Sequence, residues 1–233
     1  MSLVAQVGLG ERELVGIVGA GGKSTLLLGL GRELASAGES VVMTTTTKMG
    51  ADQLPSWAVA CRSVGEVAEA LGFGRPVFLL EDVDTSKIVG APAELVDKVF
   101  AQMDAGYVLA EADGAAGRLV KAPAEHEPVI PATTTLVIVV AGLRAVGSPI
   151  AEVSHRPQRV ASLLGCDVDH VLKPADLAAV VAHPQGGMWH VPETARVVVA
   201  LTGADGPAAS EVQERLASEP RIERVVVVGR YGT

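Results

Sequence analysis

Aromatic residues are scarce in this sequence and make up only 3% of the chain. Hydrophobic residues of all kinds nevertheless reach 48%, and the mean hydropathy is +0.35, which argues against global disorder and allows a sizeable core. That core must therefore consist mainly of Val, Leu, Ala and Ile. Continuous runs of these residues are typical of strands that are buried on both faces of a parallel sheet.

The chain also has few cysteines, no long basic block and no long apolar segment. Cys61 and Cys166 lie far apart and form no CxxC pattern, which favours reduced thiols in a cytoplasmic protein. The net charge of −8 without clustered Lys and Arg argues against duplex nucleic acid as a partner, although a single nucleotide remains compatible. We see no signal peptide, and no apolar run approaches the ~20 residues that cross a bilayer. We therefore expect a cytoplasmic protein that binds neither nucleic acid nor membrane.

Apolar strand-like segments alternate with helical segments along the chain, which indicates βαβ units and a mainly parallel sheet. We predict a single three-layer α/β domain over residues 1–233. The expected strands are 12–18, 40–46, 76–80, 106–112, 135–141, 195–201 and 223–228, and the expected helices are 23–37, 64–71, 92–103, 156–164, 174–182 and 208–217.

Two segments do not follow this alternation. Residues 81–91 have no strong helical period and are predicted to form a hairpin or a loop insertion. Residues 114–134 are rich in Gly and Pro, and the prolines at 123, 128 and 131 exclude a regular helix there. Because a loop of about twenty residues is unusual inside a compact α/β domain, we expect this one to be functional.

A glycine-rich loop lies between a buried strand and a helix in the stretch VGIVGAGGKSTLLL, residues 15–28. The usual Walker A pattern is G-x-x-x-x-G-K-[ST], but Ile17 stands where its first glycine belongs, which leaves a shorter G-x-x-G-K-S. Backbone N–H groups of residues 20–25 can still surround phosphate oxygens, because glycine permits close approach and positive φ. The helix N-terminus favours the same anion. The candidate phosphate-binding residues are Gly19, Ala20, Gly21, Gly22, Lys23, Ser24 and Thr25.

Lys23 and Ser24 have distinct expected roles in this loop. Lys23 would reach the β- and γ-phosphates of a nucleoside triphosphate, and the Ser24 hydroxyl would ligate Mg²⁺. The alternative is a glycine-rich turn that contains GKS by chance. The position between a buried strand and an amphipathic helix favours the nucleotide site.

Ligands of doubly wound sheets lie beyond the carboxyl ends of the strands, where two further groups of residues occur. In TTTTK, Thr46, Thr47 and Lys48 can contact phosphate, Mg²⁺ or an attacking water, although threonine is also common in solvated edge strands. In YVLAEADG, Glu111 and Asp113 lie two residues apart and would share a face. Such a carboxylate pair would hold Mg²⁺, and a helix N-cap is the alternative for Asp113.

A third strand end carries LTGADG at residues 201–206. It resembles the N/T-K-x-D motif with which guanine-specific P-loop proteins bind the base, except that Gly203 replaces the lysine, and a plain turn is an equal alternative. In the loop KAPAEHEP, His126 is either a general base near neutral pH or a solvated residue. The retained candidates are Lys23, Lys48 and His126 for catalysis and Asp205 for the nucleotide.

These motifs together resemble the YqeC-like family, whose members are described as selenium-dependent hydroxylase accessory proteins. The matching pieces are GAGGKST at 19–25, TTTTK at 44–48, EADGAAGRLVKAPAEHEPVIP at 111–131, HRPQ at 155–158 and HPQGG at 183–187. The resemblance implies a P-loop nucleotide-binding protein that serves the maturation of molybdenum-containing hydroxylases. Members of the family tend to carry Asn-Lys-x-Asp where this chain has Thr-Gly-Ala-Asp, so the resemblance does not imply a guanine preference. The short loop alone is also similar to that of Mur-type peptide ligases.

The expected function is Mg²⁺-dependent binding of ATP or GTP with slow hydrolysis, in support of metallocofactor maturation. The expected partner is a molybdenum-containing hydroxylase or its cofactor. One alternative is a small-molecule kinase or an ATP-dependent ligase. Another is a nucleotide-sensing or protein-binding module that does not turn nucleotide over.

Overall fold

The fold comes from a computed structural model, which describes residues 2–103, 106–203 and 205–229. The chain divides into two compact units. Unit 1 comprises Met1–Ile17, Ser24–Gly114 and Val129–Leu136, and unit 2 comprises Val18–Lys23, Ala115–Pro128 and Val137–Thr233. The glycine-rich loop therefore belongs to unit 2, while the helix that follows it belongs to unit 1. The single-domain organisation expected from the sequence stays a prediction.

Unit 1 is built on a mostly parallel sheet with the strand order β1–β7–β2–β5–β6–β3. Strands β1, β7, β2 and β5 are mutually parallel, and β4 adds a further parallel partner to β5. Strands β1, β2 and β7 are almost entirely buried, as their continuous apolar runs predict. The strands are β1 (Arg12–Gly19), β2 (Val41–Thr45), β3 (Lys48–Gly50), β4 (Val59–Cys61), β5 (Val77–Val83), β6 (Lys87–Gly90) and β7 (Gly106–Glu111).

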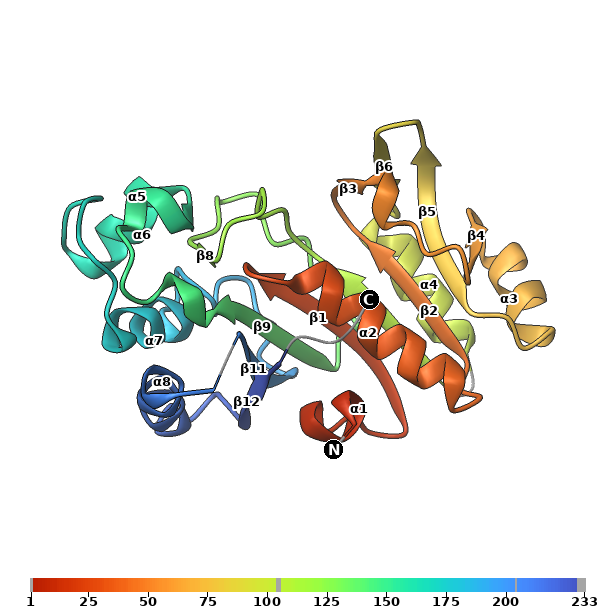
Figure 1. The fold of residues 1–233 in the computed structure, drawn as a ribbon. Coiled ribbons are helices and arrows are strands. Elements are labelled where there is room, and N and C mark those ends of the chain that lie inside the picture. Colours follow the sequence, from red (N-terminus) through yellow and green to blue (C-terminus); the bar gives the residue numbers. More distant parts are fainter. Residues whose placement is uncertain (1, 104–105, 204, 230–233) are drawn as a thin grey trace. The chain divides into compact units, whose positions relative to one another are not determined.

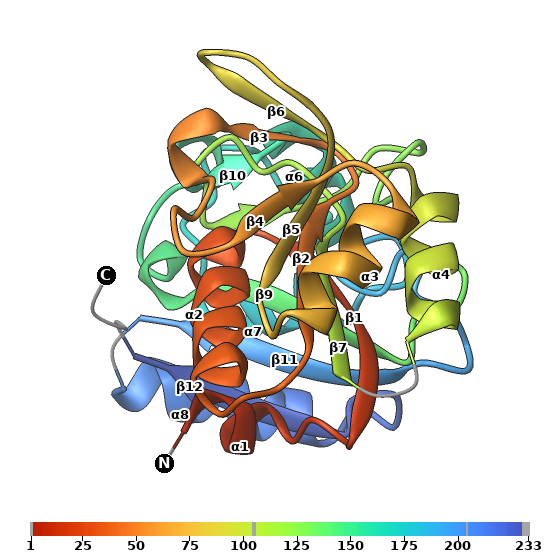
Figure 2. The same ribbon diagram turned by 90° about the vertical axis from the view of Figure 1, so that its right-hand side faces the viewer.

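Helices cover both faces of the sheet in unit 1. Figure 2 shows α2 (Lys23–Ser36) on one face and α3 (Val64–Gly72) with α4 (Ala93–Gln102) on the other. The alternation along β2 explains this arrangement, since successive strand residues point to opposite faces. Met43 lies against Gly31 of α2, whereas Val42 belongs to the apolar cluster that includes residues of α3 and α4. The short α1 (Leu3–Val7) is tied to α2, because the Leu3 N–H donates to the Glu33 carboxylate at 2.8 Å.

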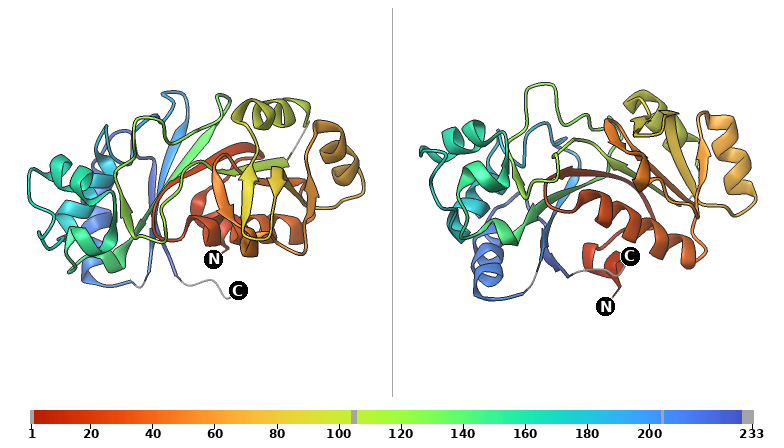
Figure 3. Two further views of the ribbon diagram at one scale, coloured as in Figure 1. Left: turned by 90° about the horizontal axis from the view of Figure 1, so that it is seen from above. Right: turned by 45° about the horizontal axis from the view of Figure 1, so that its top comes forward.

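The segment 81–91 forms an antiparallel hairpin of β5 and β6, which lie side by side in Figure 3 (yellow). Its turn is closed by Asp84, whose carboxylate accepts the N–H groups of Ser86 at 2.6 Å and Lys87 at 2.8 Å. These hydrogen bonds hold the pKa of Asp84 below its ordinary value. Strand β3 then pairs antiparallel with β6 and extends the sheet.

Unit 2 contains the strand order β12–β11–β9, with β11 and β12 parallel. A separate two-stranded parallel ladder joins β8 to β10. The helices form a chain of contacts in which α6 packs on α5 and α7, α7 packs on α8, and α8 packs on β12 (Figure 1). The elements are β8 (Val120–Lys121), β9 (Leu136–Gly142), β10 (Ser154–His155), β11 (Arg196–Thr202), β12 (Arg224–Val228), α5 (Ile150–Val153), α6 (Pro157–Leu164), α7 (Pro174–Ala182) and α8 (Pro207–Ala217), with 3₁₀ turns at Ala51–Gln53 and Leu143–Ala145.

Every strand and helix expected from periodicity is present, with small shifts at the ends. The elements that periodicity did not predict are α1, α5, β3, β4, β6, β8 and β10, which contain two to five residues each. Runs this short offer too few positions for a helical or strand period to be recognised. Within the described ranges, no helix combines the length and the apolar content that crossing a membrane requires.

Candidate functional site

The glycine-rich loop between β1 and α2 adopts a conformation that requires its glycines. Gly19, Gly21 and Gly22 have φ values of 94°, 93° and 123°. A Cβ on Gly19 would lie 2.3 Å from the Val140 carbonyl oxygen, and one on Gly21 would lie 2.7 Å from the Gly142 nitrogen. The loop therefore packs main chain against main chain at the end of β9, and side chains at these positions would separate them.

Two hydrogen bonds within unit 2 support this loop. The Ala20 N–H donates to the Val140 carbonyl at 2.9 Å, and the Thr202 hydroxyl donates to the Gly21 carbonyl. The Ala20 amide thus has a partner in the protein, and its phosphate contact stays a prediction. Thr202 belongs to the LTGADG stretch that resembles a base-binding motif, but in the structure its hydroxyl supports the phosphate loop.

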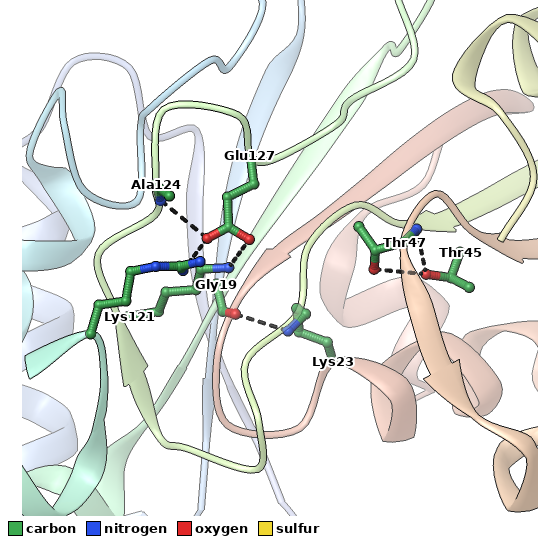
Figure 4. A network of polar contacts seen from close by, with 8 residues as sticks. Gly19, Lys23, Thr45, Thr47, Lys121, Ala124 and Glu127 are labelled. Atoms are coloured by element: carbon green, nitrogen blue, oxygen red, sulfur yellow. Dashed lines mark hydrogen bonds and ion pairs between the residues drawn. The ribbon is translucent and has the colours of Figure 1, made fainter. Parts of the chain in front are cut away.

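Lys23 is buried, with 4% of its surface exposed, and its Nζ donates to the Gly19 carbonyl at 2.9 Å (Figure 4). This places a positive charge directly over the loop glycines. A phosphate oxygen is a stronger acceptor for this ammonium group than a neutral carbonyl, because the phosphate oxygen carries negative charge. Lys23 is therefore positioned to exchange its carbonyl partner for a phosphate.

Ser24 and Glu111 are brought together in unit 1, where the Ser24 hydroxyl donates to Glu111 Oε2 at 2.8 Å. Glu111 ends β7 and is 8% exposed, and Asp113 lies two residues further along and is 2% exposed. Hydroxyl and carboxylate oxygens are the hard donors that Mg²⁺ prefers, and this ion usually retains several waters beside one or two carboxylates. In the described part of the chain, no three His, Cys, Asp or Glu side chains form a complete metal site. The donor set therefore fits Mg²⁺ that is completed by water and phosphate.

The threonine run at the end of β2 makes hydrogen bonds within unit 1 of the protein. The Thr46 hydroxyl donates to the Val129 carbonyl at 2.8 Å, and the Thr47 hydroxyl lies 3.3 Å from that of Thr45 (Figure 4). Lys48 begins β3 and is exposed. The predicted contacts of Thr46, Thr47 and Lys48 with phosphate or water stay predictions.

The other candidates lie at the surface. Thr25 is exposed in the first turn of α2, and His126 is exposed in a turn of the segment 115–128 of unit 2. Asp205 is exposed in the segment that leads into α8, and its neighbour Ala204 lies outside the described residues. The roles of His126 in catalysis and of Asp205 in base binding stay predictions.

HPQGG at residues 183–187 terminates α7. A Cβ on Gly186 would lie 2.1 Å from the Val180 carbonyl oxygen, and one on Gly187 would lie 2.3 Å from that of Val181. The Gly187 N–H donates to the Val180 carbonyl at 3.0 Å, which caps the end of the helix. These two glycines therefore serve the fold of unit 2.

A buried ion cluster in unit 2 centres on Glu127, a residue that the sequence did not single out. Its carboxylate contacts Lys121 Nζ at 2.9 Å and the Arg156 guanidinium, and it accepts the Ala124 N–H at 3.1 Å (Figure 4). Burial raises the pKa of Glu127, but the Ala124 N–H and the charges of Lys121 and Arg156 outweigh burial and lower that pKa below its ordinary value. The cluster ties the loop 121–127 to the residue that precedes α6.

We expect Glu127→Gln to lower the free energy of unfolding by about 3 kcal/mol at neutral pH, because it leaves two cations without their buried carboxylate. The pKa of Glu127 is lower in the folded chain than in the unfolded chain, where it is about 4.3. Its contribution is therefore fully present above that pH and is lost as the pH falls through the folded-state pKa. Urea unfolding between neutral and acidic pH measures both effects.

Glu125→Gln is the matched control for this prediction, since Glu125 is exposed in the same loop. Its expected effect is within about 0.5 kcal/mol at every pH. Equal stability and equal acid sensitivity in the two variants would show that the cluster contributes nothing to the fold.

Comparisons with known proteins agree with this geometry. A family model described as "YqeC protein" matches residues 15–158. The "Uncharacterized protein YqeC" of Escherichia coli (strain K12) is 35% identical over 202 residues, which cover 84% of this chain and 78% of that relative. These matches and the phosphate-loop geometry support a nucleotide-binding P-loop protein.

One solved structure with the same fold is chloroplast FtsY from Physcomitrella patens, with a TM-score of 0.50 and 18% identity. The match covers 100% of this chain, whereas the chain spans 63% of the length of that FtsY. At this identity the likeness concerns the fold alone. The fold is therefore a three-layer, P-loop NTPase-like α/β fold with a mainly parallel sheet, as the sequence predicted.

Proposed function

The chain belongs to the YqeC family, and from this premise we propose that it binds ATP or GTP together with Mg²⁺ and hydrolyses the nucleotide slowly. The hydrogen bond from Ser24 to Glu111 is the observation that carries the proposal. It joins the hydroxyl that follows the loop lysine to a carboxylate at the end of a neighbouring strand. P-loop NTPases hold their magnesium ion with this combination of a loop hydroxyl and a strand-end carboxylate.

Each residue of the loop would then have a defined task. Lys23 would leave the Gly19 carbonyl and neutralise charge that develops on the transferred phosphoryl group. Ser24 and Glu111 would hold Mg²⁺, which would neutralise negative charge on the phosphates of the nucleotide. Gly22 and Thr25 are exposed, which leaves the start of α2 accessible to an anion.

The biological setting that we propose is the maturation of selenium- or molybdenum-dependent hydroxylases in the cytoplasm. The resemblance of the motifs at 19–25, 44–48 and 111–131 to the YqeC-like family supports this setting. The partner would be such a hydroxylase or its cofactor. Phosphate release without an added acceptor would support hydrolysis, whereas turnover that requires an acceptor would support a kinase or ligase.

The metal site is tested by titrating labelled ATP and GTP against wild type and Glu111→Gln, with and without Mg²⁺. We expect Mg²⁺ to increase the affinity of wild type for the nucleotide. In Glu111→Gln this Mg²⁺-dependent increase should be about tenfold smaller, which corresponds to a loss of about 1.4 kcal/mol. Asp113→Asn is measured alongside, because Asp113 is the second predicted carboxylate. Mg²⁺-independent binding in all three proteins would contradict the proposed metal site.

A further inference from the structure

The Thr45 hydroxyl is buried, and the protein uses its full hydrogen-bonding capacity. Thr45 is 0% exposed, and its hydroxyl donates to the Glu111 carbonyl at 3.0 Å. The same oxygen accepts the Thr47 N–H at 3.2 Å and lies 3.3 Å from the Thr47 hydroxyl. A hydroxyl has one donor and two acceptor positions. With these three contacts in place, Thr45 is not available to bind phosphate or metal directly.

The bond from Thr45 acts where the ladder between β2 and β7 ends. Thr45 and Glu111 are the last pair in the parallel register of these strands. Beyond this pair, the Glu111 carbonyl also accepts the Thr46 N–H at 2.9 Å, so it receives two donors from the same turn. Strand ends open more easily than strand centres, and an added donor at the last carbonyl opposes that opening.

The residue held in this way is the one that carries the proposed metal ligand. The Glu111 carboxylate accepts the Ser24 hydroxyl, while its main chain is held by Thr45 and Thr46. On the other side, the Ala112 N–H donates to the Ile17 carbonyl at 2.9 Å. The main chain around Glu111 is therefore fixed from both neighbouring strands.

Thr44 provides an internal comparison. It is also 0% exposed, but its hydroxyl donates to the Leu79 carbonyl of β5 at 2.7 Å and also lies 3.2 Å from the carbonyl of its neighbour Thr45. The shorter of these bonds supports the sheet on the side away from β7. The two threonines therefore match in burial and in the kind of bond they make, and they differ in the strand that they hold.

We infer that Thr45 is a positioning residue for the Mg²⁺ site, and that it acts by fixing the main chain of Glu111 so that the carboxylate meets Ser24. This inference rests on the proposed function. It assigns the conspicuous threonine run a role in presenting a metal ligand. Groups that orient a metal ligand typically affect metal affinity by about 10–100-fold.

The test compares Thr45→Val, Thr45→Ala and Thr45→Ser with Thr44→Val. The first measurement is the Mg²⁺ concentration that gives half-maximal nucleotide binding. We expect Thr45→Val and Thr45→Ala to raise this concentration about tenfold while leaving Mg²⁺-free nucleotide affinity unchanged. Thr45→Ser should restore the wild-type value because it retains the hydroxyl. Thr44→Val should lose stability without changing the Mg²⁺ requirement.

Two outcomes of this titration would overturn the inference: an equal rise in Thr45→Val and Thr44→Val, or no recovery in Thr45→Ser. The second measurement is made without nucleotide, on crystal structures of wild type and the variants. Separation of Ser24 Oγ from Glu111 Oε2 in Thr45→Val but not in Thr44→Val supports the inference. Retention of that contact in both variants overturns it. A wild type that binds no nucleotide refutes the proposed function, and the structures then still decide the role of Thr45.

Discussion

Replacing Lys23 with alanine is expected to weaken the binding of nucleoside triphosphate by about 100-fold. The lysine Nζ already lies over the loop, 2.9 Å from the Gly19 carbonyl, and a bound triphosphate would offer it charged oxygens instead. A hydrogen bond to a charged group contributes about 1.5–3 kcal/mol, and a loss of about 2.7 kcal/mol corresponds to 100-fold in affinity. Titration of labelled ATP and GTP in the presence of Mg²⁺ measures the loss.

Lys23→Met separates the charge of this lysine from its packing. Methionine retains much of the apolar stem in the buried position of Lys23, which is 4% exposed, but carries no ammonium group. We expect Lys23→Met to lose as much affinity as Lys23→Ala while unfolding closer to wild type. Lys98→Ala, at an exposed position of α4, should bind as wild type does. Equal binding by wild type and Lys23→Ala would refute the nucleotide site.

The fold could be predicted because its main strands and helices each repeat one period over enough residues. Segments such as 135–141 and 195–201 each contain a continuous apolar run, and they form β9 and β11. The sequence does not decide between a hairpin and a loop insertion at residues 81–91, because the turn depends on one side chain, Asp84, which accepts main-chain N–H groups. Such a local hydrogen bond leaves no periodic signal in the sequence.

The sequence predicts which strand ends carry the candidate site, but not the contacts of each side chain there. The sequence assigns Ser24 and Glu111 to Mg²⁺ from their positions after a loop and at the end of a strand, and in the structure Ser24 Oγ lies 2.8 Å from Glu111 Oε2. The rule that parallel strands share one functional edge accounts for this proximity. The binding of Mg²⁺ by these residues stays a prediction. The same rule does not distinguish Thr45, whose hydroxyl donates to the Glu111 main-chain carbonyl, from the neighbouring threonines. The rule identifies the functional edge of the sheet but not the direction in which each hydroxyl points.

The ion cluster around Glu127 shows a different limit. Arg156 contacts Glu127 from 29 residues away in the chain, and the two residues belong to separate motifs, HRPQ and KAPAEHEP. Their pairing depends on how the loop 121–127 meets the residue before α6, and Arg156 takes a left-handed conformation there, with φ of 60°. Pairings between an irregular loop and the start of a helix follow no spacing rule, so a single sequence does not reveal them.

Gly19→Ala is expected to have the largest effect on stability, about 3 kcal/mol or more, because two penalties act together. The φ of 94° is unfavourable for alanine, which costs roughly 1–2 kcal/mol. The added Cβ would lie 2.3 Å from the Val140 carbonyl oxygen, and relief of such overpacking typically costs a further 1–3 kcal/mol or so. Urea unfolding measures the loss, and nucleotide binding should disappear with it because the loop must move away from β9.

Gly147→Ala is the matched control, because it carries only the first of these two penalties. Gly147 lies in the same unit with φ of 87°, and a Cβ there would meet nothing within 4 Å. Its variant carries the conformational penalty of roughly 1–2 kcal/mol without the collision, and it should bind nucleotide normally. The difference in the free energy of unfolding between Gly19→Ala and Gly147→Ala therefore measures the cost of the collision between the added Cβ and β9. If both variants lose the same stability and Gly19→Ala still binds nucleotide, the loop does not depend on close packing against Val140.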